Sequence, residues 1–117
     1  MKEVSVIIPT YNCGNYLACA IESVSRQKVD LEIILVDDAS VDQTKEIVKR
    51  LQKITTYPIN YICNSKNLGV SFSRNRGVQF AKGKYIAWLD ADDWWMEKKL
   101  IKQLKKLEQT NGIFCYT

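Results

Sequence analysis

The sequence predicts an open α/β fold in which helices cover both faces of a mostly parallel sheet. Three observations support this: four short apolar runs rich in β-branched residues, amphipathic stretches of helical length between them, and polar residues directly after each run. Strands that alternate with helices are joined by right-handed crossovers, which place helices over the sheet. The chain has 117 residues, 46% of them hydrophobic, which is enough for one domain with its own core.

Each predicted strand ends at a residue that favours a turn. Pro9 lacks the backbone N–H that a strand in mid-sheet donates, so the first strand is expected to end near residue 8 or 9. Asp37, Asn64 and Asp90 follow the other three strands. The four strands are predicted at 4–8, 31–36, 59–63 and 85–89. Another apolar run at 113–116 predicts a fifth strand, so residues 1–117 are interpreted as a single domain that stops before a second half of a longer protein.

Apolar residues recur at helical spacing in the segments between and after the strands. The predicted helices are 16–27, 41–54, 70–81 and 96–110. Ser40 and Gln43 have the spacing of a capping box, which predicts that the second helix opens at Val41. The outward lysines of the last helix are Lys98, Lys99, Lys102, Lys105 and Lys106. We interpret them first as a solvated face, and second as a surface attracted to anionic membranes.

The absence of histidine excludes several classes of site. Ser-His-Asp and Cys-His sites, histidine-ligated zinc and an imidazole general base all need that residue. The four cysteines form no C-x-x-C pair, which excludes a zinc knuckle and is typical of a reducing compartment. No glycine-rich phosphate loop is present, so phosphate would be bound by metal and arginine. With no signal-peptide or membrane-span pattern, we expect a cytoplasmic protein.

Three carboxylates, those of Asp90, Asp92 and Asp93, follow the fourth predicted strand. Ligands of open parallel sheets bind outside the carboxyl ends of the strands, so these acids lie where a site is expected. Carboxylates this close repel one another unless a cation joins them. Oxygen ligands favour Mg²⁺ or Mn²⁺, together with the phosphates of a nucleotide. The alternative is that Asp92 or Asp93 caps the helix that follows.

A pair of acids, Asp37 and Asp38, follows the second strand. A carboxylate there can accept a hydrogen bond from the N–H of a base or from ribose hydroxyls, or it can belong to a turn. We interpret Asp37 as a site residue and leave Asp38 open between the two. Arg74 and Arg76 either lie on the surface or bind phosphate through their guanidinium groups. Residues 59–117 hold 10 basic and 5 acidic side chains, so this half would attract an anionic ligand.

Taken together, these strand ends resemble the nucleotide-binding front half of the family 2 glycosyltransferases, inverting enzymes of the Rossmann-like GT-A fold. The resemblance runs nearly from end to end of the chain, with its segments in order and at fitting spacings. The matching segments are Val4-Ser5-Val6-Ile7-Ile8-Pro9-Thr10-Tyr11-Asn12, Val36-Asp37-Asp38-Ala39-Ser40, Asn67-Leu68-Gly69 with Ser73-Arg74-Asn75-Arg76-Gly77, and Leu89-Asp90-Ala91-Asp92-Asp93.

The resemblance implies a role for each matching site residue. The substrate-binding residues would be Pro9, Thr10, Tyr11, Asn12, Asp37, Asp38, Arg74, Asp90 and Ala91. The first three of these would line the nucleoside pocket, Asp37 would read the base, and Arg74 would lie near the diphosphate. Asp90-Ala91-Asp92 would be the D-x-D element, with Asp90 toward ribose and Asp92 on Mn²⁺ or Mg²⁺.

The function implied is transfer of a sugar from a nucleotide-diphosphate donor, with a UDP-sugar as the first choice, by a single inverting displacement. The acceptor would be a glycan, a lipid-linked molecule or a protein, and no nucleic acid is expected as a partner. The general base would lie beyond Thr117, so these residues alone are expected not to transfer sugar. The location would be the cytoplasm, with peripheral association at the inner face of the membrane.

Two alternatives come from other functional classes. One is a receiver-like signalling domain that binds Mg²⁺ and accepts a phosphoryl group on Asp90. Its acid pair should follow the first strand, whereas here Pro9-Thr10-Tyr11 does. The other is a nucleotide-binding module without catalysis.

Overall fold

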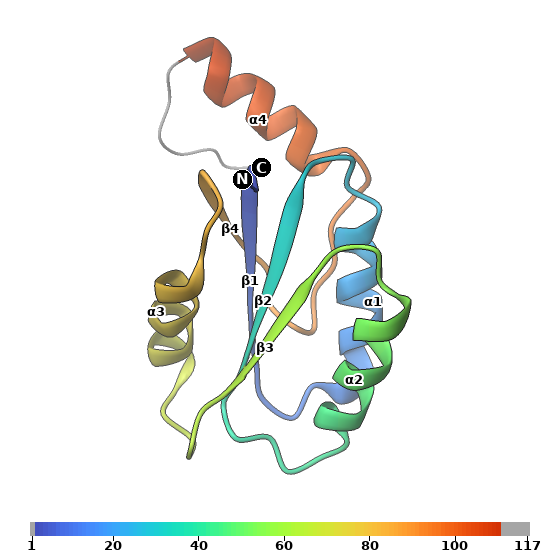
Figure 1. Ribbon diagram of the computed structural model, residues 1–117, viewed down its shortest axis with the longest axis vertical. Coiled ribbons are helices and arrows are strands. Elements are labelled where there is room, and N and C mark those ends of the chain that lie inside the picture. Colours follow the sequence, from blue (N-terminus) through green and yellow to red (C-terminus); the bar gives the residue numbers. More distant parts are fainter. Residues whose placement is uncertain (1, 111–117) are drawn as a thin grey trace.

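The structure is a computed structural model that describes residues 2–110. Within them lies a four-stranded sheet whose neighbouring strands are all parallel, in the order β3-β2-β1-β4 (Figure 1). The strands are β1 (Val4–Thr10), β2 (Leu31–Asp37), β3 (Ile59–Cys63) and β4 (Tyr85–Trp88). The predicted parallel α/β sheet is therefore confirmed, while the predicted strand at 113–116 lies outside the described residues.

Helices cover both faces of this sheet, as expected. They are α1 (Gly14–Ser25), α2 (Thr44–Ile54), α3 (Val70–Phe80) and α4 (Lys99–Thr110). Figure 1 shows α1 and α2 on one face, α3 on the other, and α4 near the end of the sheet where β1 begins. The carboxyl ends of the strands, and the loops that follow them, are thus left at the opposite edge from α4.

The strand order decides against the receiver-like alternative. Doubly wound sheets of the flavodoxin and receiver type have the order 2-1-3-4-5, which places the third strand beside the first. Here β3 lies outside β2, and β4 pairs with the other side of β1. This is the beginning of the 3-2-1-4 order of nucleotide-binding Rossmann sheets.

Two apolar clusters hold the layers together. The larger cluster lies on the α1 and α2 side and also takes in Trp95, from the loop before α4, and Leu100 and Leu104 from α4 itself. The smaller one, on the α3 side, is made of Ile7, Ile34, Val36 and Ile62. Every residue of β1 is buried, as is typical of a parallel strand covered on both faces.

Strand β1 continues through Pro9 to Thr10, so the prediction that Pro9 ends the strand was wrong. The Ile7 carbonyl accepts a hydrogen bond from the N–H of Leu89 (3.2 Å), so the backbone polar groups of Ile7 face the β4 side. Because residues two apart in a strand face the same neighbour, the backbone nitrogen of Pro9 faces that side as well. Pairing with β4 stops at Ile7↔Trp88. Pro9 therefore lies past the last paired residue on that side, where a missing N–H costs no ladder hydrogen bond.

Helix α2 begins at Thr44 instead of Val41, and the predicted capping box does not form. The Ser40 hydroxyl accepts a hydrogen bond from the N–H of Asn12 (2.9 Å). The Gln43 amide donates to Asn15 Oδ1 (2.9 Å). Both side chains join neighbouring loops, and Asp42 accepts from the Thr44 N–H instead (3.1 Å).

Helix α4 is anchored by Gln27, a buried side chain after α1. Its Oε1 accepts a hydrogen bond from the N–H of Leu100 and its Nε2 donates to the carbonyl of Met96, both at 3.0 Å. Lys98, Lys102, Lys105 and Lys106 are exposed, in agreement with a solvated face, whereas Lys99 is half-buried with its Nζ 5.1 Å from the centre of the Trp95 ring. Attraction to anionic membranes stays a prediction. No helix within the described range is long and apolar enough to cross a membrane.

Gly77 sets the closeness of α3 to β1, and thereby the position of the site residues on α3. A Cβ at Gly77 would lie 2.6 Å from Ile7 Cγ2, inside the fully buried centre of the sheet. We expect Gly77→Ala to lower the free energy of unfolding by about 1–3 kcal/mol, as overpacking does. Urea denaturation measures this, with Gln79→Ala on the exposed side of the same helix as the control. Equal stability of both variants would contradict the contact.

Candidate active site

The ends of β1 and β2 are fastened together where the sheet stops. Thr10 pairs with Asp37 in the register, and the Asp38 N–H donates a hydrogen bond to the Thr10 carbonyl (2.8 Å). The next strand joins the same edge, because the Asn64 N–H donates to the Asp37 carbonyl (2.8 Å). Predicted site residues from two different strands are thus brought side by side.

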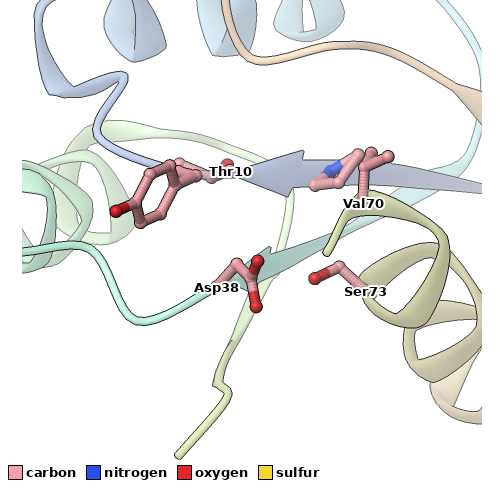
Figure 2. A pocket seen from close by; sticks show the side chains of 6 residues that line it. Thr10, Asp38, Val70 and Ser73 are labelled. Atoms are coloured by element: carbon pink, nitrogen blue, oxygen red, sulfur yellow. The ribbon is translucent and has the colours of Figure 1, made fainter. Parts of the chain in front are cut away.

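A small cavity of about 80 Å³ opens beside these strand ends (Figure 2). Its lining residues come from the end of β1 and the residue after it, from the residue after β2, and from the start of α3: Pro9, Thr10, Tyr11, Asp38, Val70 and Ser73. Figure 2 shows the Asp38 carboxylate and the Ser73 hydroxyl directed toward the same space. A cavity of this volume holds several water-sized groups, which is room for one edge of a ligand.

Asp37 is buried at the end of β2, and each of its carboxylate oxygens accepts one hydrogen bond. The Ser40 N–H donates to Oδ1 (2.9 Å), and the Tyr61 hydroxyl donates to Oδ2. Asp37 is not among the residues that line the cavity. An ionised carboxylate offers about four lone-pair sites, so Asp37 has lone pairs beyond these two hydrogen bonds, but only 4% of the residue is exposed.

Asp38 holds the loop that leads into α3. Its Oδ1 accepts from the Asn64 amide (2.8 Å) and the Leu68 N–H (2.7 Å), and its Oδ2 accepts from the Gly69 N–H (2.9 Å). The Asn64 amide also donates to the Ser73 hydroxyl (3.0 Å). Asp38 therefore lines the cavity and also holds the loop beside it. The sequence left Asp38 open between a site residue and a turn residue, and these hydrogen bonds favour a structural role.

The hydrogen bonds also decide the charge of Asp38. Burial disfavours its ionised form, but the donors from Leu68, Asn64 and Gly69 stabilise the carboxylate more strongly. The pKa of Asp38 therefore lies below its usual value. Asp42, whose carboxylate accepts from Thr44 and from the Gly14 N–H, has a lowered pKa for the same kind of reason.

The loop after β1 is joined to the loop after β2 through Asn12. Its N–H donates to Ser40 and its Oδ1 accepts from the Val41 N–H (2.9 Å). Asn12 has a φ of 50°, a left-handed conformation that asparagine tolerates better than most residues. Asn12 thus shapes the loop that presents Tyr11, whose side chain is 46% exposed.

Arg74 and Arg76 have different surroundings, although they are two residues apart on α3. Arg74 Nη2 lies 3.3 Å from Asp90 Oδ1, which brings α3 and the end of β4 together. Arg76 Nη1 donates to the Cys63 carbonyl (3.0 Å) and to Asn64 Oδ1 (2.8 Å). Arg74 therefore lies beside Asp90 at the sheet edge, while Arg76 holds the end of β3, and the ligand-binding role of Arg74 stays a prediction.

The acids after β4 are not equivalent. Asp92 and Asp93 are exposed, and Asp93 accepts a hydrogen bond from the Trp94 N–H (2.8 Å). Ala91 is buried in the larger core cluster. No group of three metal-ligating side chains occurs among residues 2–110. One or two carboxylates, with water and diphosphate oxygens, nevertheless form an ordinary Mg²⁺ or Mn²⁺ site, so the donors present fit such an ion.

Several residues that build the site were missed by sequence reasoning. They are Ser40, Asp42, Tyr61, Asn64 and Ser73. Asn64 is the one with a usable signal, because it follows a predicted strand directly and a polar residue there is directed to the ligand edge. Tyr61 lies within a strand, and nothing in its sequence neighbourhood distinguishes it from a packing residue.

The sequence is similar to that of curated glycosyltransferases. It is 37% identical over 118 residues to the Escherichia coli "UDP-Glc:alpha-D-GlcNAc-diphosphoundecaprenol beta-1,3-glucosyltransferase WfaP", which covers 100% of this chain and 46% of that protein. The chain thus spans less than half the length of this relative.

The chain is also similar in structure to solved glycosyltransferases. Residues 1–349 of S. aureus TarS in complex with UDP-GlcNAc match with a TM-score of 0.83 and 27% identity, covering 93% of this chain and 32% of that one. The mannosyltransferase PcManGT of Pyrobaculum calidifontis, in complex with GDP-Man and Mn²⁺, matches with a TM-score of 0.84 and 26% identity, covering 91% and 32%.

The family assignment agrees with the geometry of the sheet edge. The model of the family described as "Glycosyl transferase family 2" matches residues 5–117, which is nearly the whole chain and includes every strand end described above. The chain belongs to glycosyl transferase family 2.

Proposed function

We propose that this chain binds the nucleotide-sugar donor, a UDP-sugar, in a glycosyltransferase that inverts the anomeric carbon. The observation that carries the proposal is the meeting of three strand ends at one edge, where Thr10, Asp37 and Asp90 come from separate strands. Membership of the family supports the type of reaction. The similarity to a structure in complex with UDP-GlcNAc supports the type of donor.

The donor would lie across the edge from β2 to β4. The exposed ring of Tyr11 offers a face for stacking against the base, and Asp37 accepts a hydrogen bond from a base N–H. Asp90 would accept from a ribose hydroxyl. Arg74, now 3.3 Å from Asp90, would turn its guanidinium toward the diphosphate, for which its planar fork is well shaped.

A divalent cation completes this arrangement in the proposal, with Asp92 as its protein ligand. The complex of PcManGT with Mn²⁺ supports the choice of Mn²⁺ or Mg²⁺. When bound, the ion would supply Lewis-acid stabilisation of the charge on the departing diphosphate. Arg74 would add a second positive group near the same charge.

In the reaction, an acceptor oxygen would form a bond to the anomeric carbon while the bond from that carbon to the diphosphate oxygen breaks. The proton of the acceptor hydroxyl has to pass to a general base. Asp37 and Asp38 hold structural hydrogen bonds, and Asp90 is paired with Arg74. We therefore assign the base to the second half of a longer protein, together with binding of a glycan, lipid-linked or protein acceptor.

The base-reading role of Asp37 gives the most direct test of donor binding. We expect Asp37→Ala to weaken binding of uridine and of UDP by the same factor, about 5- to 150-fold, because a base donor is left unpaired at a cost of about 1–3 kcal/mol. Isothermal titration calorimetry of both ligands measures this. The control is Asp30→Ala, which removes an exposed carboxylate paired with Lys2, just before the start of β2 and so at the other end of the strand from Asp37.

Two results would contradict the proposal. One is uridine binding that is unchanged in Asp37→Ala while the protein stays folded. The other is a wild-type chain that binds neither UDP nor GDP in the presence of Mn²⁺.

A further inference from the structure

The loop that carries Asp92 is fastened to α1 by side chains that the reaction scheme does not use. Asp92, Asp93 and Trp94 are exposed. Ala91 before them and Trp95 after them are buried in the larger core cluster. A stretch of three residues has few conformations when both of its ends are held. Whatever holds Trp95 therefore also limits where the Asp92 carboxylate can lie.

Ser23, in the last turn of α1, holds the backbone of Trp95. Its hydroxyl oxygen accepts a hydrogen bond from the Trp95 N–H (3.0 Å), and its hydroxyl proton is donated to the Ala20 carbonyl (2.7 Å). In Figure 1 the chain after β4 passes beside α1 on its way to α4. Ser23 is only 5% exposed, so water is poorly placed to replace it as the acceptor. Loss of the hydroxyl would leave a buried N–H without a partner unless the backbone at Trp95 moved.

Gln27, just after α1, holds the next part of the same loop. Its side-chain amide accepts a hydrogen bond from the Leu100 N–H and donates one to the Met96 carbonyl, both at 3.0 Å. Lys98 lies between these two contacts and has a φ of 68°. A residue other than glycine keeps this left-handed conformation only where its surroundings fix it. The two glutamine hydrogen bonds therefore fix the path of the chain into α4.

We propose that Ser23 is a positioning residue for the divalent cation: through the Trp95 N–H it holds the loop after β4 so that the Asp92 carboxylate is in place before the ion binds. Gln27 supports the same loop further along. The inference rests on the proposed function, since it assumes that Asp92 is the protein ligand of the metal. A carboxylate on a fixed loop binds more tightly than one on a mobile loop, because less ordering is needed on binding. Ser23 thus strengthens metal-dependent binding of UDP without touching the metal or the nucleotide.

The test compares the affinity for UDP with Mn²⁺ and with EDTA, because the ratio of the two affinities gives the contribution of the metal. Calorimetry measures both. We expect Ser23→Ala to lower this ratio by about 3- to 10-fold relative to wild type, the range for ordering one side chain on binding. Uridine binding should not change, because the nucleoside has no diphosphate for the metal to bind. Without ligand or metal, the Trp95 N–H should exchange faster with solvent in this variant, as measured by NMR.

Ser25→Ala is the matched control. The Ser25 hydroxyl lies on the same helix and donates to the Ile21 carbonyl (2.9 Å), so this variant removes a serine hydroxyl whose hydrogen bond stays within α1. It should keep the wild-type ratio. If Ser23→Ala does not fold, Ser23→Cys keeps the shape of the side chain and replaces the oxygen by sulfur, which is a weak acceptor. Ser23→Cys should lower the same ratio, to a smaller extent than the alanine variant.

The outcomes separate the inference from the proposed function. A wild-type ratio that is unchanged in Ser23→Ala, or in Ser23→Cys where only that variant folds, overturns the role of Ser23 alone. A wild type that binds UDP equally with Mn²⁺ and with EDTA overturns the metal site of the proposed function, and this inference with it. A ratio that falls equally in Ser25→Ala, or uridine binding that weakens as much as UDP binding, shows a general effect on the fold and also overturns the inference.

Discussion

Asp38→Ala is expected to lower the free energy of unfolding by about 3–5 kcal/mol, because three buried or half-buried donors lose their acceptor and each unsatisfied group costs about 1–3 kcal/mol. The donors are the Asn64 amide and the N–H groups of Leu68 and Gly69. A domain of this size is stable by about 5–15 kcal/mol, so the change removes a large part of the total. Urea denaturation at neutral pH measures it.

The contribution of Asp38 to the free energy of unfolding should decrease as the pH is lowered. Its pKa is lowered in the folded protein, so its contribution is fully present above the unfolded value of about 3.9 and is lost as the pH falls through the folded value. The difference in stability between wild type and Asp38→Asn should therefore shrink as the pH is lowered below about 4. A difference that stays constant down to pH 2 would contradict the charge state assigned here.

Asp30→Ala is the control for both measurements. Asp30 is an exposed acid whose ion pair with Lys2 spans 3.2 Å, and exposed pairs contribute only about 0–1 kcal/mol. If Asp38→Ala costs no more than Asp30→Ala, the Asp38 hydrogen bonds do not hold the start of α3. Binding of UDP should also weaken in Asp38→Ala, since Ser73 and Arg74 follow the loop that Asp38 fastens.

The sequence predicted the order of strands and helices because two local properties indicate it. These are the spacing of the apolar residues and the turn-forming residues at which each element ends. The positions of Asp37 and Asp90 at the carboxyl ends of strands were predicted from the sequence, since an acid directly after a predicted strand lies at that edge, and their roles in binding a ligand stay predictions. The paired roles of Asp37 and Asp38 were harder to predict. Adjacent residues at a strand end project to opposite sides of the sheet, and which side carries donors depends on segments far away in the sequence.

Tyr61 and the capping box that did not form also show that distant segments decide the partners of polar side chains. Tyr61 is 24 residues from Asp37 along the chain, and only the pairing of β3 beside β2 brings its hydroxyl to the carboxylate. Ser40 and Gln43 have capping-box spacing, yet Asn12 and Asn15 compete for their side chains across 28 residues. Local patterns predict elements well, but polar side chains choose among partners that only the tertiary structure supplies.

Removal of the divalent cation is expected to weaken UDP binding by on the order of 1000-fold, while leaving uridine binding unchanged. Two opposite unit charges 4 Å apart attract by about 4 kcal/mol at the effective dielectric near a protein surface, and the diphosphate would lose at least one such interaction. The described residues offer few replacements, because no glycine-rich phosphate loop is present and Arg74 already shares its charge with Asp90. Calorimetry of UDP and uridine, with Mn²⁺ or with EDTA, gives both numbers.

Asp92 should account for this metal dependence, and its neighbour provides the control. Asp92→Ala is expected to bind UDP with the same reduced affinity whether Mn²⁺ or EDTA is present, because the protein ligand of the ion is gone. Asp93→Ala removes an equally exposed carboxylate, one that accepts the Trp94 N–H, and should keep the wild-type response to EDTA. Equal UDP affinity of wild type with Mn²⁺ and with EDTA would exclude a metal-bridged diphosphate. A loss of metal response in Asp93→Ala alone would move the ligand to Asp93, one residue further from the strand end that holds Asp90 against Arg74.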